Sequence, residues 1–504
     1  MKVSEIKIGT ILSYIIILLN TLIGIFYTPF LTRMLGQSEY GLYSLVSTII
    51  AYLTILDFGF GNAITVYSSK YIAKNDVKGL KKLNGMFLVI YILIGLVATI
   101  FGVILTLNIQ YFFGQTMNPE ELETAKILMI ILTFNVAVTF PFSIFSNIIT
   151  AYEKFIFSKT LNIIRVVALP ICMTPLLLNQ FKSVSLAILT TVINVGILIA
   201  NTIYCVKKLN IKFNFKHFDR VVFFEIFSYS FYIFLNQVTD KIHLGVNNII
   251  VGAIVGTVAV AVYNIALQFN TMYFSFSTAI SSVFLPKISK MEAKHASDED
   301  FSEIFLKTGR IQYLVMALIL SGFILFGKQF IIILFGNAYE DSYIIACILM
   351  IPVTIPLIQN VGMSIMQAKN KFKFRAVLSL FVAILGIVTS ILLAKPFGGI
   401  GAAIGTSICF VVANFFILNF YYYKVIKLDI IKFWKEICKI SIPILVIFVP
   451  ACFIVSYLDY QNILFFVIQI LGYTILYCAV VWKFAMNEEE KSLFSQPVKR
   501  IFKR

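Results

Sequence analysis

Long apolar stretches separated by short polar segments recur along the whole 504-residue chain. Each has about 20 residues, the length that an α-helix needs to cross a hydrocarbon core about 30 Å thick. The pattern therefore predicts an all-α polytopic membrane protein with about fourteen transmembrane helices and no soluble domain. The predicted spans are 10–31, 42–66, 84–107, 125–150, 161–178, 184–206, 222–253, 260–285, 311–333, 343–368, 376–395, 400–423, 440–457 and 462–482.

The basic residues predict how the chain is oriented. Most of the 41 Lys and Arg residues fall in every second connecting segment and in the two terminal segments. Because positively charged loops stay in the cytoplasm, both termini are predicted to be cytoplasmic. The same distribution explains the net charge of +17, because basic loops set the orientation and attract the anionic headgroups of membrane lipids. Nucleic acid is not an expected partner, since a nucleic-acid-binding protein gathers its basic residues on one soluble face.

The sequence contains no motif that is typical of a cofactor or metal site. The seven cysteines and three histidines are scattered, so no metal site and no cofactor are predicted. The stretch GGIGAAIG, 398–405, resembles a nucleotide-binding loop only superficially. It opens a predicted span, and the spacing of Gly401 and Gly405 favours close helix packing instead.

Two short matches indicate that the chain is duplicated. LGQSEYGLYS, 35–44, and VGTVAVAVYN, 255–264, share a Gly-x6-Tyr pattern, and AYEKFIF, 151–157, matches AKNKFKF, 368–374, at nearly the same offset. Six spans separate the copies, so the repeats are parallel, and such lobes enclose a central cavity that opens alternately to either side. The predicted domains are an N-lobe, 1–208, a C-lobe, 209–425, and a C-terminal helix pair with a cytoplasmic tail, 426–504.

The seventh span carries a polar face at membrane depth, which must contact protein or water. Its residues follow helical spacing, and the first span has a milder version that includes Asn20. The polar residues of the seventh span are Asn236, Asp240, His243 and Asn247, flanked by Gln237, Lys241 and Asn248. The adjacent charges of Asp240 and Lys241 favour a functional role, although a structural ion pair between the lobes stays open as an alternative. For His243, a role as a hydrogen-bonded core residue also stays open.

Asp57 stands near the end of the second predicted span, in ILDFGFGNAIT, 55–65. Two interpretations are open. The carboxylate is either solvated or paired with a basic loop at the cytoplasmic end of the span, or it is a charged group of the central cavity.

The stretch PFLTRMLGQSEYGLYSLVSTIIAYLTILDFGFGNAIT, 29–65, resembles the N-terminal signature of bacterial polysaccharide flippases. These are the Wzx-type O-antigen and capsule transporters of the multidrug/oligosaccharidyl-lipid/polysaccharide (MOP) superfamily. The duplicated lobes, the fourteen spans and FGGIGAAIGTSI, 397–408, also fit that family. Family members usually carry Arg after the seventh-span Asp, and Lys241 lacks the planar fork that grips phosphate at two points.

The resemblance implies a flippase that moves an undecaprenyl-pyrophosphate-linked oligosaccharide across the bacterial cytoplasmic membrane, from the inner to the outer leaflet. Substrate-binding candidates are Lys241 and Arg33 for the pyrophosphate, and Asn236, Gln237, Asn247, Asn248 and Asn20 for the sugars. Candidates for a coupling proton or sodium ion are Asp240, Asp57 and His243. The charged segment 286–310 is expected to form a solvated linker helix at the membrane surface, where glycan-assembly enzymes could dock.

Other classes of protein fit the sequence less well. A glycosyltransferase or polymerase would need an acid–base constellation, and none is visible, so no enzymatic activity is expected. A drug or cation antiporter of the same superfamily would have twelve spans and a more acidic cavity. A flippase for the peptidoglycan precursor lipid II stays open as the nearest alternative.

Overall fold

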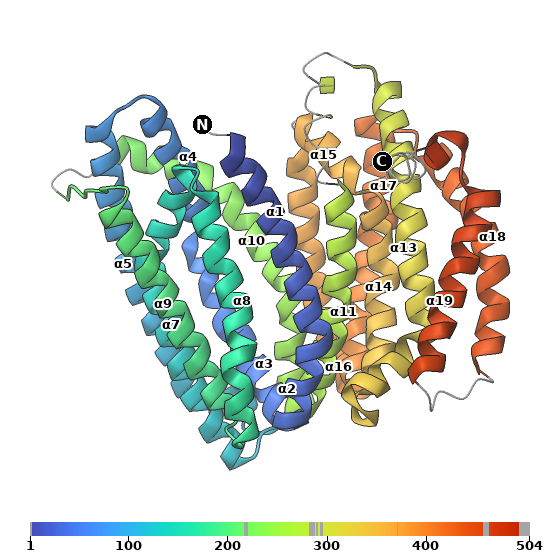
Figure 1. The fold of residues 1–504 in the computed structure, drawn as a ribbon, viewed down its shortest axis with the longest axis horizontal. Coiled ribbons are helices and arrows are strands. Elements are labelled where there is room, and N and C mark those ends of the chain that lie inside the picture. Colours follow the sequence, from blue (N-terminus) through green and yellow to red (C-terminus); the bar gives the residue numbers. More distant parts are fainter. Residues whose placement is uncertain are drawn as a thin grey trace. The chain divides into compact units, whose positions relative to one another are not determined.

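A computed structural model describes residues 3–215, 220–281, 288, 291–292, 296–369, 371–456 and 463–492. Every regular element within these residues is a helix (Figure 1), which confirms the predicted all-α class. The α-helices are α1 (Val3–Leu22), α2 (Thr28–Leu35), α3 (Gln37–Leu53), α4 (Phe60–Ala73), α5 (Val77–Leu107), α6 (Ile109–Phe113), α7 (Pro119–Ala151), α8 (Phe155–Leu178), α9 (Ser183–Lys207), α10 (Arg220–Ile254), α11 (Thr257–Ser281), α13 (Asp298–Phe335), α14 (Asp341–Ile358), α15 (Asn360–Ala368), α16 (Phe372–Val411), α17 (Leu418–Tyr421), α18 (Ile430–Ser456) and α19 (Ile463–Val480).

Short turns of other helical types extend several of these helices. The π-helical turns are Ile23–Tyr27, Val412–Ile417, Tyr422–Ile426 and Val481–Ala485, and the 3₁₀ turns are Thr54–Asp57 and Asn337–Tyr339. The chain is a multi-pass membrane protein, because 12 helices among the described residues are long and apolar enough to cross a bilayer.

One of these 12 candidate spans, Lys373–Ile426, is 54 residues long and folds back on itself. Gly398 has a non-helical φ of 56° and ψ of −138°, and the Ser390 hydroxyl donates to the carbonyl of Ala402 across 2.9 Å. In a straight helix, Ser390 and Ala402 would be roughly 18 Å apart, so this segment contains two helical limbs. The predicted total of about fourteen spans stays a prediction.

The glycines of GGIGAAIG lie where these two limbs touch. A Cβ on Gly401 would stand 1.9 Å from the carbonyl oxygen of Leu393, and one on Gly405 would stand 2.6 Å from the backbone nitrogen of Ser390. Neither position has room for a side chain. The prediction that these glycines serve close helix packing is therefore confirmed.

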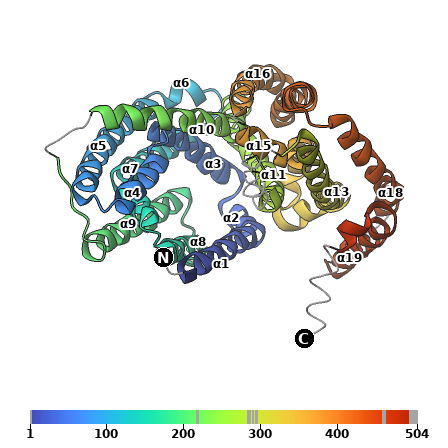
Figure 2. The same ribbon diagram turned by 90° about the horizontal axis from the view of Figure 1, so that it is seen from above.

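The chain forms two compact units, Met1–Asn264 and Ile265–Arg504. In the first unit, α5, α7 and α9 pack side by side, and α1 runs along α8 (Figure 1). Helix α10 crosses α3 and α4 in the end-on view (Figure 2), although the sequence assigns it to the second repeat. These units reflect packing rather than internal repeats, so the domain boundaries after 208 and 425 stay predictions.

The two Gly-x6-Tyr stretches have corresponding geometry. Gly36 joins α2 to α3 with a φ of 79°, and Gly256 joins α10 to α11 with a φ of 115°. A positive φ is strained for residues that carry a Cβ, which explains why both junctions have glycine. The shared geometry supports the duplication inferred from the sequence.

In the second unit, α13 is longer than the sequence predicts. It begins at a capping box, in which the hydroxyl of Ser297 accepts from the backbone of Asp300 and the Asp300 carboxylate accepts from the backbone of Ser297. The helix then continues unbroken to Phe335. Residues 298–310 are therefore the first turns of a spanning helix, and the expected separate surface helix is wrong for this part of the segment 286–310.

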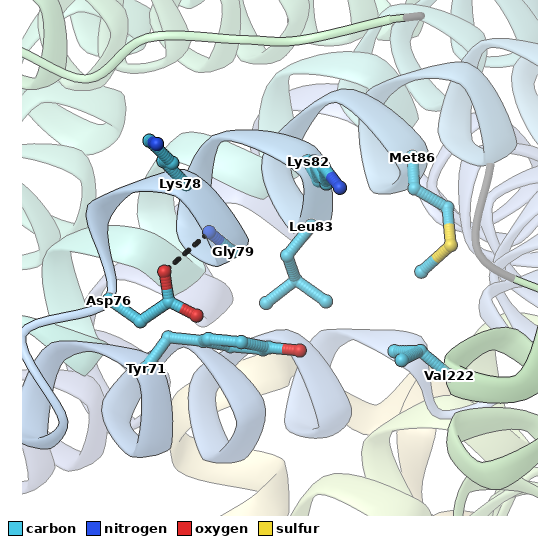
Figure 3. A pocket seen from close by; sticks show the side chains of 8 residues that line it. All are labelled: Tyr71, Asp76, Lys78, Gly79, Lys82, Leu83, Met86 and Val222. Carbon is cyan, nitrogen blue, oxygen red and sulfur yellow. Dashed lines mark hydrogen bonds between the residues drawn. The ribbon is translucent and has the colours of Figure 1, made fainter. Parts of the chain in front are cut away.

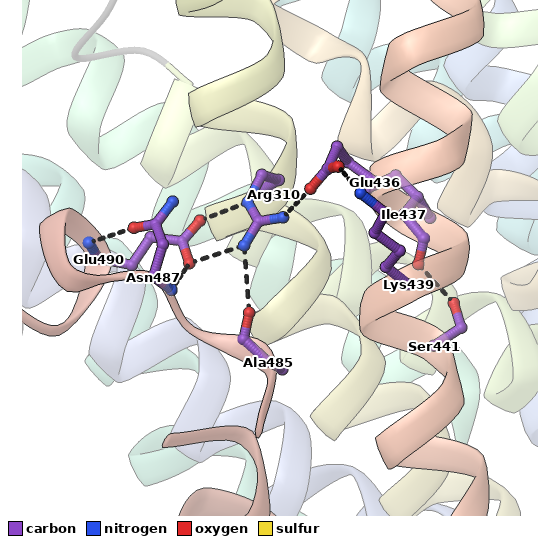
Figure 4. A network of polar contacts seen from close by, with 8 residues as sticks. All are labelled: Arg310, Glu436, Ile437, Lys439, Ser441, Ala485, Asn487 and Glu490. Carbon is purple, nitrogen blue, oxygen red and sulfur yellow. Dashed lines mark hydrogen bonds and ion pairs between the residues drawn. The ribbon is translucent and has the colours of Figure 1, made fainter. Parts of the chain in front are cut away.

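A buried ion network fastens the C-terminal helices to α13 (Figure 4). Arg310 donates to Glu490 through Nε at 2.7 Å and Nη2 at 3.0 Å, and to Glu436 of α18 through Nη1 at 2.6 Å. Nη2 also donates to the carbonyl of Ala485, at the end of the turn that follows α19. Helix α13, helix α18 and the segment after α19 thus meet at one guanidinium group.

Candidate functional site

The second span is broken in its middle, at Asp57. Helix α3 ends at Leu53, a 3₁₀ turn covers Thr54–Asp57, and α4 then continues to Ala73. Phe58 and Gly59 both have positive φ, at 49° and 75°. Since 14 helical residues follow the break, Asp57 does not lie at the end of its helix pair.

Gly59 allows α10 to approach this break. A Cβ at Gly59 would lie 2.9 Å from the side chain of Ile233 and 3.0 Å from the carbonyl oxygen of Ser230, both on α10. Position 59 therefore needs glycine both for its backbone conformation and for the space beside it.

The Asp57 carboxylate is half-buried and held by fixed polar groups. Its Oδ1 accepts a hydrogen bond of 2.6 Å from the hydroxyl of Tyr91 on α5, and its Oδ2 accepts one of 3.3 Å from the backbone N–H of Gly61. Asn147 of α7 lies beside Gly61, because its Nδ2 would be 3.3 Å from a Cβ there. Asp57 therefore belongs to a polar cluster between α4, α5 and α7.

Among the described residues, Asp57 forms no ion pair with a basic side chain. The interpretation as a carboxylate paired with a basic loop therefore does not fit its contacts. A carboxylate that accepts from a tyrosine and a backbone amide inside a spanning bundle is costly to bury, which favours a functional role.

A second group of polar side chains joins α3, α10 and α11. Asn247 and Asn248 are buried, with 5% and 3% of their surface exposed. Asn247 donates from Nδ2 to the hydroxyl of Tyr263 at 2.6 Å, and Asn248 donates to Thr48 at 3.3 Å and to Asn264 at 3.4 Å.

Asn264 extends this ladder of hydrogen bonds. Its Nδ2 donates to the hydroxyl of Tyr40 at 2.9 Å and to that of Ser44 at 3.2 Å, both on α3. Buried amides bonded across helices hold spanning helices together. In this conformation Asn247 and Asn248 bond to protein, so their predicted role in binding sugar hydroxyls stays a prediction.

Helix α10 carries most of the other predicted residues. The side chains of Asn236, Asp240 and His243 lie outside the described part of the structure. Gln237 and Lys241 are half-buried, and the backbone carbonyl of Lys241 accepts a hydrogen bond of 2.9 Å from the hydroxyl of Tyr52.

The first span supplies the two remaining predicted residues. Asn20 is exposed on α1 and donates from Nδ2 to the carbonyl of Ile16, and Arg33 is exposed in the last turn of α2. Between them the helix passes through the π-helical turn Ile23–Tyr27. Single π-helical turns occur often at functional sites.

The sequence did not single out the partners of these residues. Tyr91 and Asn147 are polar groups within long apolar runs, and nothing in their own helices pairs them with Asp57. Tyr263, by contrast, could have been found, because it is the tyrosine of the second Gly-x6-Tyr stretch. Among the residues that the structure describes, no group of three or more His, Cys, Asp and Glu side chains could hold a metal ion.

The fold is similar to those of solved membrane proteins. The lipid II flippase MurJ, in an inward closed conformation, matches with a TM-score of 0.73 and 16% identity over 97% of this chain and 99% of that one. An inward-facing multidrug resistance MATE family transporter matches with a TM-score of 0.65 and 15% identity over 80% of this chain and 98% of that one. The chain therefore shares its fold with these two proteins.

The sequence comparisons are more specific. The polysaccharide biosynthesis protein family matches residues 6–292, more than half of the chain, and the chain belongs to this family. A probable low-salt glycan biosynthesis flippase of Haloferax volcanii is 24% identical over 190 residues, a match that covers 37% of this chain and 39% of the relative. The family resemblance seen in residues 29–65 is confirmed.

Proposed function

We propose that this protein is a flippase that moves an undecaprenyl-pyrophosphate-linked oligosaccharide from the cytoplasmic to the outer leaflet. The observation that carries the proposal is the match of residues 6–292 to the polysaccharide biosynthesis protein family. The relative from Haloferax volcanii, described as a glycan biosynthesis flippase, points the same way. An O-antigen or capsule repeat unit is the substrate class that we propose.

The chemistry of this task requires polar groups inside a membrane bundle. A pyrophosphate and a sugar chain cannot cross hydrocarbon unaided, whereas the isoprenoid tail can stay in the lipid. Lys241 and Arg33 would counter the pyrophosphate, and the amides of α1 and α10 would bond to the sugars. Transport would follow alternating access, since the fold belongs to a superfamily with two repeat lobes.

Asp57 is the best placed of the described candidates for a coupling ion. Its hydrogen bonds to Tyr91 and Gly61 link the broken second span to α5, so a change of protonation or a bound Na⁺ would alter contacts between helices. Asp240 and His243 stay proposals from the sequence alone. No cofactor and no enzymatic step enter this mechanism.

The distribution of Lys and Arg supports a location in the bacterial cytoplasmic membrane with both termini in the cytoplasm. In that orientation the start of α13 faces the cytoplasm. Glycan-assembly enzymes are proposed partners there.

A flippase for lipid II is the second candidate. The fold of this chain matches that of MurJ over 97% of its length, whereas the match to the MATE transporter covers 80%. A drug or cation antiporter is the third candidate. It ranks below the lipid II flippase because MurJ matches more of this chain than the MATE transporter does.

The test is flipping in proteoliposomes. Purified protein is reconstituted with fluorescent undecaprenyl-pyrophosphate oligosaccharide, and a membrane-impermeant quencher reports the label that has crossed, with and without a pH or Na⁺ gradient. We expect Asp57→Asn, Asp240→Asn and Lys241→Ala to abolish flipping. The matched control Glu123→Gln removes an exposed carboxylate of α7 and should leave flipping unchanged.

The same vesicles separate the alternatives. Faster flipping of lipid II than of the oligosaccharide would move the second candidate to first place. Folded wild-type protein that flips neither lipid, but exchanges a cationic dye for protons, would overturn the flippase proposal.

A further inference from the structure

A pocket of about 270 Å³ lies between α4, the first turns of α5 and the start of α10 (Figure 3). The ring of Tyr71 forms one wall, and the backbone of α5 at Gly79 lies opposite to it. Leu83, Met86 and Val222 form an apolar end of the pocket, away from Asp76. All of these elements belong to the first compact unit.

The rim of this pocket is basic. Lys78 and Lys82 line it from the same face of α5, one turn apart. The acidic side chain in the lining, Asp76, is already engaged, because its Oδ1 accepts a hydrogen bond of 2.8 Å from the N–H of Gly79. Among the described residues, neither lysine forms an ion pair with a carboxylate. Two lysines against one carboxylate leave the lining with a net positive charge.

The position of the pocket along α5 matches the lipid headgroup layer. The apolar run of this helix, 86–107, is roughly 33 Å long, which is about the thickness of a hydrocarbon core. Its first residue, Met86, is at the apolar end of the pocket, and the two lysines precede it by one to two turns. The lysines are therefore expected at headgroup level, whereas Leu83 and Met86 are buried in the helix bundle, with 3% and 5% of their surface exposed.

Gly79 lets the ring of Tyr71 pack directly against α5. A Cβ at this position would stand 2.4 Å from both the Tyr71 ring and Asp76 Oδ2. A larger residue would therefore displace the Tyr71 wall of the pocket.

We propose that this pocket binds the phosphate group of an anionic lipid, with Lys78 and Lys82 on the phosphate. Two lipids present this chemistry: a resident anionic phospholipid and the polyprenyl phosphate carrier. The site does not depend on the proposed transport activity, because its ligand can be either lipid.

The test measures lipid binding to the purified full-length chain by native mass spectrometry. Phosphatidylglycerol, phosphatidylcholine of the same acyl length and undecaprenyl phosphate are titrated separately. We expect Lys78→Gln/Lys82→Gln to weaken binding of the phosphate lipids by roughly 10- to 30-fold, since each lysine near the surface contributes on the order of a fivefold factor.

The control is Lys74→Gln/Lys81→Gln, which removes the same charge from the same segment without touching the pocket lining. We expect it to change the affinity about twofold or less, because only long-range attraction is lost. Equal losses in the two double variants would overturn the proposal, since binding would then follow net charge alone.

A third variant tests the pocket itself. Gly79→Leu should abolish phosphate-lipid binding while circular dichroism shows a folded protein, and the lysine variants keep the test valid if this one does not fold. Equal binding of phosphatidylcholine, whose phosphate is balanced by its choline cation, or full competition by the same concentration of inorganic phosphate, would overturn a site for an anionic lipid phosphate. Tighter binding of phosphatidylglycerol or of undecaprenyl phosphate supports the proposal and identifies the occupant.

Discussion

The ion network at Arg310 gives a prediction of stability that can be worked out from its contacts. Only 10% of the Arg310 side chain and 5% of the Glu490 side chain are exposed. Replacing Arg310 with Met removes four hydrogen bonds and leaves Glu490 buried without a counter-ion.

The expected costs differ between the partners. Breaking a buried pair by removing one partner costs about 3–5 kcal/mol, so Arg310→Met should lower the free energy of unfolding by that amount. Glu490→Gln should cost about 1.5–3 kcal/mol, because Arg310 keeps Glu436 as its counter-ion. The double variant should cost no more than Arg310→Met alone, since Glu436 retains Lys439 at 2.6 Å.

The chain provides its own probes for this measurement. Its two tryptophans, Trp434 and Trp482, lie in α18 and in the turn after α19, close to Glu436 and Ala485 in sequence. Unfolding by sodium dodecyl sulfate in mixed micelles, followed by tryptophan fluorescence, therefore reports on the helices that Arg310 joins. The matched control is Glu303→Gln, which removes an exposed partner of Lys307 and should give the wild-type curve.

Two results would refute this reasoning. One is an Arg310→Met variant that loses less than about 1 kcal/mol, which would mean that the carboxylates find water or other partners. The other is strict additivity in the double variant, which would mean that Arg310 and Glu490 do not interact.

Three further substitutions test the first unit by the same unfolding in sodium dodecyl sulfate, followed by far-ultraviolet circular dichroism because both tryptophans lie in the second unit. Tyr91→Phe removes the hydroxyl donor from the half-buried carboxylate of Asp57 and should cost about 1–3 kcal/mol. Gly59→Ala should cost about 1–3 kcal/mol, because φ is +75° at this position and Ile233 leaves no room for a Cβ. The control Gly196→Ala should be neutral or stabilising, because Gly196 lies in the interior of α9 with open space around it. Asn248→Ala should cost about 0.5–1.5 kcal/mol through its lost bonds to α3 and α11, more than the exposed amide variant Asn20→Ala.

Each of these expectations has a contrary outcome. Wild-type stability of Tyr91→Phe would mean that the carboxylate is satisfied without the tyrosine. Equal effects at the two glycines would show that backbone conformation does not matter at the break. A larger loss for Asn20→Ala than for Asn248→Ala would contradict the ladder between the helices.

The sequence predicted features that depend on residues close together in the chain. The length of each apolar run is a local quantity, so the sequence located the apolar centres of the spans. Several helices begin five or more residues before the predicted start, among them α5 at Val77, α7 at Pro119 and α18 at Ile430. Spacing also predicted the close packing at Gly401 and Gly405, and the Gly-x6-Tyr repeat located Gly36 and Gly256 at corresponding junctions. The length of α13 was underestimated because its charged first turns look like a solvated linker when their partners are unknown.

Partners on other helices were decided only by the tertiary structure. Asp57 bonds to Tyr91 of α5, and Arg310 bonds to Glu436 and Glu490, which follow it far along the chain. Periodicity shows which face of a helix is polar, but not which helix covers that face, because this depends on how all the helices pack. The sequence thus determined a polytopic bundle of the polysaccharide biosynthesis family with charges inside it, and packing alone decided whether each charge is paired, bonded to neutral groups or open to a ligand.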